Sequence, residues 1–347
     1  MPIDSPRDPL YYQARRHLLF SNDASIAHLQ RRLRVGPQRA TTLRQALQGD
    51  AVQYQAETDS WHIHQEADRQ TDFLLHEKLA QAAQLIQNAT ALMVVAGAGM
   101  GIDSGLRDFR SESDFWEAHP ALGAQRLRLE SMAAPQAFKQ RPITAWGVYG
   151  HWLNQFRAST PHAGFDLLKG WSARMPQGGF VYTSNIDGHF QKAGFPSARV
   201  YECHGTIHRL QCTANCSGEL WPTANLHPQM DEHACELQSA LPLCPLCGAL
   251  ARPNARMFND WQWNQARSDR QRALLDRWLD NAAAPLVLEI GADRTLAAMR
   301  HFAQRMKQRG STLIRIHLRD ANIHNPHDIE LALGAKEALE SIQLLLN

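Results

Sequence analysis

Short apolar runs alternate with segments of helical period over most of the chain. An amphipathic helix is expected at residues 76–89, with Leu79, Ala82 and Ile86 on one face. The apolar runs that follow have the length of buried strands and cover residues 91–96, 180–183, 200–203, 285–290 and 312–316. Strands that alternate with helices predict a parallel, doubly wound, Rossmann-like α/β sheet.

The first 73 residues have a different pattern. Residues 25–33 carry apolar side chains at helical spacing, Gly36 and Pro37 interrupt the helix, and residues 39–47 form a second helical segment. Residues 51–64 then suggest two strands with a turn at 57–59. Two short helices followed by a β-hairpin predict a winged helix-turn-helix domain over residues 1–73.

The charge of this N-terminal segment is uneven. Residues 24–44 contain five arginines and no acidic residue, although the whole chain has a net charge of only +2. Such a cluster is typical of a face that binds the phosphates of DNA. The alternative is a helical extension that docks on the main domain or forms a dimer contact, with its arginines solvated.

The composition indicates a globular protein. Of its 347 residues, 44% are hydrophobic and 20% are charged. This length is enough for two or three folded units. We expect the second domain to cover residues 74–347. No apolar run is long enough to span a bilayer and no secretory signal is evident, so we expect a cytoplasmic protein without a membrane partner.

The apolar run at residues 91–96 ends in Gly97, Ala98 and Gly99. Glycines after a strand allow backbone N–H groups to approach a phosphate, and Arg107 and Arg110 follow closely. The spacing differs from the usual dinucleotide motif, because the third glycine comes one residue early. Despite this difference, the glycines and the two arginines favour a nucleotide-binding turn. A tight turn from strand to helix is the plainer alternative.

Polar residues also follow the next predicted strands. The run at residues 180–183 is followed by Ser184, Asn185, Ile186 and Asp187, and the run at 200–203 by His204. Open α/β sheets bind ligands at the carboxyl ends of their strands. An imidazole there suits general-base chemistry near neutral pH, whereas the alternative for His204 is a hydrogen-bonded core histidine.

Two short cysteine pairs predict a metal site. Four of the six cysteines form these pairs, at Cys212, Cys216, Cys244 and Cys247. Four thiolates in a cytosolic chain indicate a closed, structural zinc site, here within a small module inserted at about residues 206–256. Cys235 and His233 lie between the pairs and offer an alternative fourth ligand.

Together these motifs resemble the sirtuins, the NAD-dependent protein deacylases, from about residue 77 onward. The resemblance rests on these groups in this order: Gly97-Ala98-Gly99, Ser104-Gly105-Leu106, Asp108-Phe109-Arg110, Thr183-x-Asn185-Ile186-Asp187 with Ala193-Gly194, His204-Gly205, and the two cysteine pairs. Residues 25–52 also resemble the winged-helix module at the C-terminus of the bacterial DNA translocase FtsK.

The sirtuin resemblance implies an enzyme that passes an acyl group from lysine to ADP-ribose and releases nicotinamide. It implies His204, Asn185 and Asp187 as catalytic residues, with His204 as the general base, and an acylated protein as substrate. The residues implied for NAD binding are Gly97, Ala98, Gly99, Asp108, Phe109, Arg110, Ser184, Asn185, Ile186, Asp187, Gly291 and His317.

Several positions depart from the sirtuin pattern. Sirtuins usually have glutamine at Ser184 and asparagine at His317, and Gly-Thr-Ser where this chain has Gly291, Ala292 and Asp293. The segment that usually reads Phe-Gly-Glu, at residues 258–260, is Phe-Asn-Asp. These differences leave open two further functions, namely a sirtuin-fold NADase or ADP-ribosyltransferase, and a DNA-binding sensor of NAD or ADP-ribose.

Overall fold

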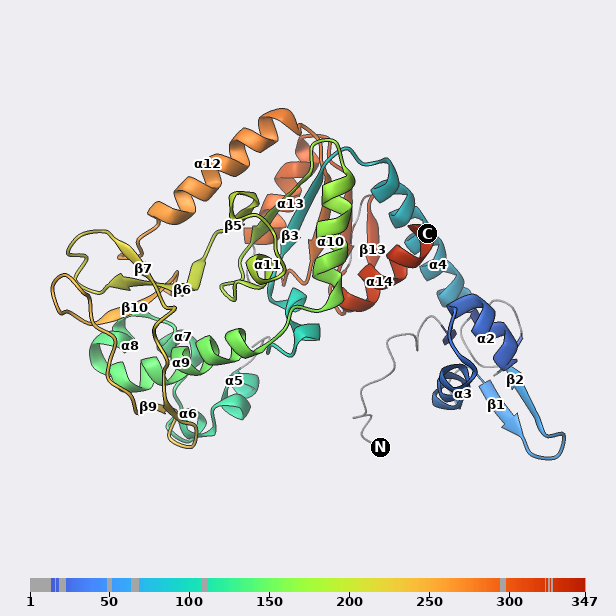
Figure 1. Ribbon diagram of the computed structural model, residues 1–347, viewed down its shortest axis with the longest axis horizontal. Coiled ribbons are helices and arrows are strands. Elements are labelled where there is room, and N and C mark those ends of the chain that lie inside the picture. Colours follow the sequence, from blue (N-terminus) through green and yellow to red (C-terminus); the bar gives the residue numbers. More distant parts are fainter. Residues whose placement is uncertain are drawn as a thin grey trace. The chain divides into compact units, whose positions relative to one another are not determined.

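The computed structural model describes residues 14, 15, 17, 18, 23–48, 52–63, 69–107, 112–293, 298–321, 323, 325 and 327–346. The chain forms two compact units (Figure 1). The N-terminal unit comprises Met1–Gln87 and Ser341–Asn347, and the large unit comprises Asn88–Glu340. Of the predicted site residues, Asp108, Phe109 and Arg110 lie outside the described residues.

The N-terminal unit contains the predicted pair of helices and the β-hairpin. Its elements are α2 (Ile26–Leu33), α3 (Pro37–Ala46), β1 (Val52–Gln55), β2 (Ser60–Ile63) and most of α4 (Arg69–Asn88). The Ser25 hydroxyl accepts a hydrogen bond from the His28 N–H and caps α2, while Pro37 starts α3. Strands β1 and β2 pair antiparallel, and Leu29, Leu43 and Val52 belong to the buried core of this unit.

The large unit is built on a six-stranded parallel sheet (Figure 1). Its strands lie in the order β13-β12-β11-β3-β4-β5. They are β3 (Leu92–Ala96), β4 (Gly179–Thr183), β5 (Val200–Glu202), β11 (Leu286–Ile290), β12 (Leu313–Ile316) and β13 (Ile329–Leu331). The predicted doubly wound sheet is confirmed, since the first strand in sequence lies in the middle and the chain adds strands first on one side and then on the other.

Helices cover the sheet on both faces. Side chains of α12 (Ala266–Asn281) and α13 (Ala298–Gln308) share a buried cluster with Met93, Val95 and Phe180. Helix α10 (Ala163–Arg174) contacts β3 and β4. Helix α14 (Ala335–Leu346) ends the described chain, and α11 (His189–Lys192) and the short η3 (Ser197–Arg199) connect β4 to β5.

Two smaller layers share a second core. The helical layer contains α5 (Glu112–Ala118), α6 (Pro120–Ala124), α7 (Leu129–Met132), α8 (Pro135–Gln140) and α9 (Pro142–Ala158). The inserted module contains β6 (Gly205–Cys212), β7 (Leu220–Pro222) and β10 (Ala251–Ala255) in one antiparallel sheet, and the pair β8 (Met230–Asp231) and β9 (Glu236–Leu237). Trp146 lies in this core and donates to the Ala251 carbonyl at 2.9 Å, so its indole joins the two layers.

Among the described helices, none combines the length and the apolar character that crossing a membrane requires.

Candidate functional site

The carboxyl ends of the parallel strands bring the predicted polar residues to one edge of the sheet. Gly97 follows β3, Ser184 follows β4, His204 comes two residues after β5, Gly291 follows β11 and His317 follows β12. The direction in which strands are added reverses between β3 and β11, which is where open sheets of this kind form their ligand crevice.

The glycines at this edge allow two backbones to pack together. A Cβ atom on Gly99 would lie 2.6 Å from the Gly291 Cα, and one on Gly97 would lie 2.6 Å from the Gly291 carbonyl oxygen. The Gly99 N–H donates to that same oxygen at 3.1 Å. Gly291 also has a φ of +61°, which favours glycine. The loop after β3 and the loop after β11 are therefore held together by close backbone contact.

Asn185 is fixed by its neighbours after β4. Its backbone N–H donates to the Thr183 hydroxyl at 3.0 Å, and that hydroxyl donates to the Ala96 carbonyl at 2.9 Å. The Asn185 side-chain Nδ2 donates to the Gly97 carbonyl at 3.0 Å. Because the amide nitrogen is used in this way, the side-chain oxygen of Asn185 is oriented as a hydrogen-bond acceptor.

Asp187 is a buried carboxylate. It accepts a hydrogen bond from the His189 N–H at 2.8 Å, which starts α11. Burial raises the pKa of Asp187 to about 6, with a smaller contribution from Glu202. The side chain of Asp187 is therefore mostly ionised at neutral pH and is held in one orientation by the start of the helix.

His204 follows β5 in a half-buried position, as the sequence predicts. Burial lowers the pKa of its imidazole to about 4, and the nearby Arg256 guanidinium acts in the same direction. The following residue must be glycine, because a Cβ on Gly205 would lie 2.1 Å from the Asn254 carbonyl oxygen. His204 is therefore neutral at pH 7 and can accept a proton.

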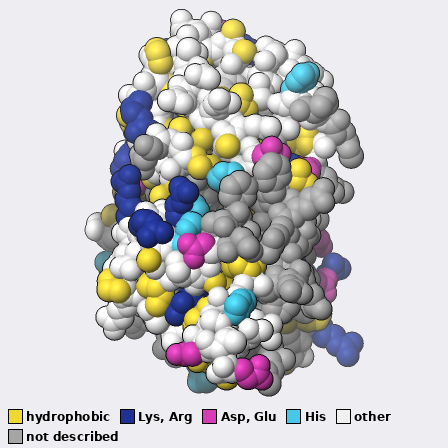
Figure 2. Space-filling model, turned by 90° about the vertical axis from the view of Figure 1, so that its right-hand side faces the viewer, with side chains coloured by type: hydrophobic (Ala, Val, Ile, Leu, Met, Phe, Trp, Pro, Cys, Tyr) yellow, Lys and Arg dark blue, Asp and Glu magenta, His cyan; other side chains and the backbone are white. Residues whose placement is uncertain are grey.

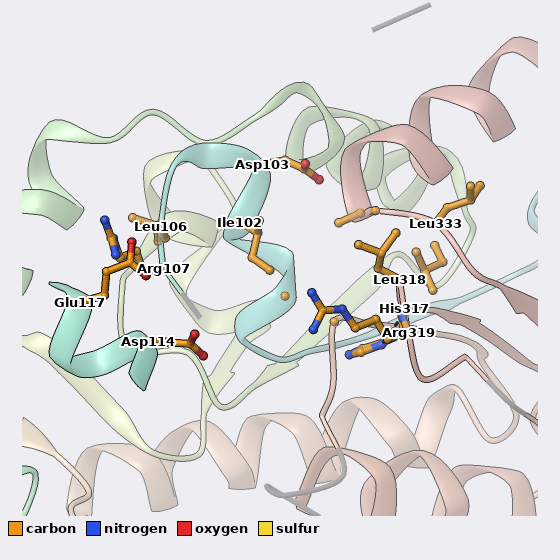
Figure 3. A pocket seen from close by; sticks show the side chains of 15 residues that line it. Ile102, Asp103, Leu106, Arg107, Asp114, Glu117, His317, Leu318, Arg319 and Leu333 are labelled. Carbon is orange, nitrogen blue, oxygen red and sulfur yellow. Dashed lines mark hydrogen bonds between the residues drawn. The ribbon is translucent and has the colours of Figure 1, made fainter. Parts of the chain in front are cut away.

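A cavity of about 760 Å³ opens at the same edge, a volume within the usual range for ligand sites (Figure 3). Three predicted residues, Gly99, Gly291 and His317, line it. Figure 3 shows Arg319 and His317 on one side of the cavity and Arg107 with acidic side chains of α5 on the other. The two arginines supply positive charge for an anionic ligand.

Arg319 was not singled out by sequence analysis. The Nδ1 atom of His317 accepts hydrogen bonds from the backbone N–H groups of Arg319 and Asp320, at 3.2 and 2.8 Å, so the histidine shapes the loop that presents Arg319. The position of Arg319, three residues after the end of β12, was the available signal.

The four paired cysteines form one cluster. Their ligand atoms all lie within 4.8 Å of one another, with Sγ···Sγ distances of 3.5 Å between Cys212 and Cys247 and 3.6 Å between Cys216 and Cys244. Thiolates about 2.3 Å from a tetrahedral zinc ion lie about 3.8 Å apart, so the cluster fits zinc. Cys235, the alternative ligand, lies elsewhere, against His119.

The segment at residues 258–260 ends in a structural ion pair. Asp260 accepts a hydrogen bond from the Arg252 guanidinium at 2.8 Å, and both side chains are almost fully buried. Its other oxygen accepts from the Met257 N–H at 3.3 Å. Phe258 and Trp261, on either side, are exposed.

Comparisons with known proteins agree with this geometry. Residues 97–273 match the model of the Sir2 family. An NAD-dependent protein deacylase of Thermococcus kodakarensis is 26% identical over 267 residues, which cover 76% of this chain and 94% of that protein. One from Deinococcus radiodurans is 28% identical over 265 residues, covering 76% and 97%.

Among solved structures, a Sir2 homologue in complex with NAD aligns with a TM-score of 0.59 and 23% identity, covering 76% of this chain and 93% of that one. At this identity the match shows that the two chains share a fold. It agrees with the parallel sheet described above. The resemblance found in the sequence is thus confirmed for the family: the chain belongs to the Sir2 family, the sirtuins.

Proposed function

We propose that the protein is an NAD-dependent protein-lysine deacylase. The observation that carries the proposal is that Asn185 and Asp187 follow β4, and His204 follows the neighbouring strand β5, in a Sir2-family chain. The relatives from Thermococcus kodakarensis and Deinococcus radiodurans, which align with this chain over nearly their full length, are NAD-dependent protein deacylases. The proposed substrates are NAD and an acylated lysine of a protein.

The residues present fit NAD. The cavity beside Gly99 and Gly291 has the volume for a dinucleotide's adenosine side, and Arg319 provides charge for its phosphates. When bound, NAD supplies the ribose carbon that accepts the acyl oxygen as nicotinamide leaves. Asp187, with the backbone of Ile186, is proposed to hold the carboxamide of nicotinamide, because its buried carboxylate can accept an amide N–H.

His204 is proposed as the general base. A neutral imidazole can take a proton from a ribose hydroxyl, and such catalysis contributes about 10²–10⁴-fold to a rate. Asn185 is proposed to orient the ribose or a water through its side-chain oxygen, since its nitrogen is bound to Gly97. The close packing of Gly99 against Gly291 keeps this edge rigid, as an electrostatically demanding transition state requires.

Nicotinamide release from NAD, measured with and without an acetyl-lysine peptide, tests the proposal. Release that depends on the peptide is expected of a deacylase. Equal release without peptide would indicate an NADase or ADP-ribosyltransferase instead. A failure to release nicotinamide with acetyl, succinyl or long-chain acyl peptides, together with tight binding of ADP-ribose, would indicate a sensor.

For the N-terminal unit we propose DNA binding by a winged-helix domain over residues 1–73. Arg31, Arg32 and Arg34 are exposed on α2 and at its end, with no acidic residue between them. Lys and Arg side chains are dark blue in Figure 2. Arg44 has a different role, because its guanidinium stacks on Trp61 at 4.6 Å and binds the Ala24 carbonyl.

Duplex affinity as a function of salt tests this second proposal. Changing Arg31, Arg32 and Arg34 to alanine should weaken binding and reduce the slope of log K against log salt by about 0.9 for each lost phosphate contact. The matched control removes the same charge from α12, through alanine at three exposed arginines, Arg270, Arg272 and Arg277. Equal effects of the two triple variants would rule out a specific DNA-binding face on α2.

A further inference from the structure

A second group of metal-binding side chains lies apart from the four-cysteine cluster. The turn between β8 and β9 faces α9 and the start of α6 across a cavity of about 240 Å³. The lining side chains with metal-binding atoms are His119, His151, His233, Cys235, Met230, Asp231 and Glu232. Thiol, thioether and imidazole groups in one small cavity are the donors that zinc and copper prefer.

Cys235 and His119 form the inner wall of this cavity. Each residue is 4% exposed, and the Cys235 Sγ lies 3.5 Å from the His119 Nδ1. The fold fixes the thiol in place, because a Cβ on Gly147 of α9 would lie 2.0 Å from the Cys235 carbonyl oxygen, and Cys235 itself has a φ of +55°. A backbone seated this tightly in a strained conformation is typical of a functional position.

The distances suit two ligands of one metal ion. A sulfur about 2.3 Å and an imidazole nitrogen about 2.05 Å from a tetrahedral zinc ion lie about 3.5 Å apart. The His151 ring lies 5.4 Å from the His119 ring, centroid to centroid, at an interplanar angle of 83°. Two imidazoles on one tetrahedral ion have centroids about 5 Å apart, so His151 lies near enough to become a third ligand once its side chain rotates.

We propose that Cys235, His119 and His151 bind a thiophilic transition metal ion, with His233 or a neighbouring carboxylate as the fourth ligand. Within the described part of the chain, the four-cysteine cluster is the group whose ligand atoms all lie within 4.8 Å of one another. At the proposed site the ligand atoms lie further apart, so metal binding requires the side chains of the half-buried His151 and the exposed His233 to rotate toward Cys235 and His119. On binding, the Cys235 thiol loses its proton to solvent, and the His119 Nδ1 exchanges its contact with sulfur for the metal.

Such an ion would join three separate segments. His119 precedes α6, His151 lies on α9, and Cys235 belongs to the inserted module. Since α9 and the β8–β9 turn already contact each other, the metal would tie the helical layer to the inserted module at the side of the turn. The site is independent of the proposed deacylase chemistry, because none of its residues is among those assigned to NAD or acyl-lysine.

Metal content per chain tests the proposal. The purified full chain is saturated with Zn²⁺ or, anaerobically, with Cu⁺, freed of loosely bound ions, and measured by elemental mass spectrometry. With Zn²⁺ the wild type should hold two ions per chain and Cys235→Ser one, because serine keeps the hydrogen bond to His119 but loses the soft ligand. Co²⁺ added to the protein carrying one zinc should give a thiolate charge-transfer band that Cys235→Ser lacks.

Two further variants make the test decisive. His151→Gln should also lose the second ion, which covers the case in which Cys235→Ser fails to fold. His301→Ala, at an exposed histidine of α13, should keep both ions. A wild-type chain that holds one zinc ion and gains no Cu⁺ or Co²⁺ at Cys235, or a Cys235→Ser variant that still holds two, would overturn the proposal.

Discussion

Replacing Asp260 with alanine should lower the melting temperature of the large unit by about 6–20 °C. The carboxylate is fully buried and pairs with Arg252, which is itself 2% exposed. Removing one partner of a buried pair leaves an uncompensated charge and costs about 3–5 kcal/mol. A domain of this size loses about 2–4 °C for each kcal/mol.

The contacts of Asp260 sharpen this magnitude. Besides Arg252, its oxygens accept from the Met257 and Gln262 N–H groups, each at 3.3 Å. The Asp260→Asn variant keeps one acceptor and should lose less than Asp260→Ala. Changing Arg252 to methionine together with Asp260→Leu should recover much of the loss, because apolar groups of similar volume remove the buried charge altogether.

Thermal unfolding followed by tryptophan fluorescence provides the assay. The matched control is Asp276→Ala, which breaks an exposed pair with Arg272 at 3.9 Å on α12 and should cost no more than about 0.5 kcal/mol. A shift for Asp260→Ala as small as that of the control would refute the idea that this buried pair holds residues 258–260 in place.

Three other outcomes are expected. Cys244→Ser should release zinc, measured by a chromogenic chelator, and unfold the inserted module, and a zinc-loaded, fully active variant would argue against a structural site. Gly99→Ala should impair NAD binding in calorimetry, because its Cβ would strike the backbone at Gly291, and unchanged affinity would contradict this. Between pH 6.5 and about 4 the denaturant midpoint should fall as pH falls, because three histidines whose pKa values are lowered by burial to about 4 stay neutral when folded but gain a proton when unfolded. Asp187 acts in the opposite sense, because its raised pKa lets the folded state bind one proton that the unfolded state does not bind near pH 5. The free energy of unfolding should therefore change by up to about 2–3 kcal/mol per pH unit near pH 5. A midpoint that does not change with pH would refute the effect of burial on these histidines. The histidines concerned are His119, His189 and His204.

The sequence predicts the strands of the sheet well where apolar runs are unbroken. It misses β13, because Ile329 and Leu331 flank Glu330 and form no run. It also gives no reason for the buried Glu289 inside the run of β11, whose carboxylate accepts from Arg315 on the neighbouring strand at 2.6 Å. Such pairing depends on which strands become neighbours.

The chemistry of the site is predicted less completely than its position. The order of motifs places His204, Asn185 and Asp187 at strand ends, and the parallel sheet brings those ends together. The contact of Gly99 with Gly291 joins residues far apart in the sequence, so no local pattern reports it. The neutral state of His204 likewise follows from burial and from Arg256, which only the fold provides.

Deacylated peptide formed per NAD consumed, compared between the wild type and His204→Ala, tests the central claim most directly. Equal amounts of the two are expected in the wild type, and His204→Ala should lose about 10²–10⁴-fold in the rate while it keeps its zinc content and melting temperature. His301→Ala, an exposed histidine, should behave like the wild type. A His204→Ala enzyme that deacylates the peptide at the wild-type rate would contradict the assignment of this sheet edge as the catalytic site.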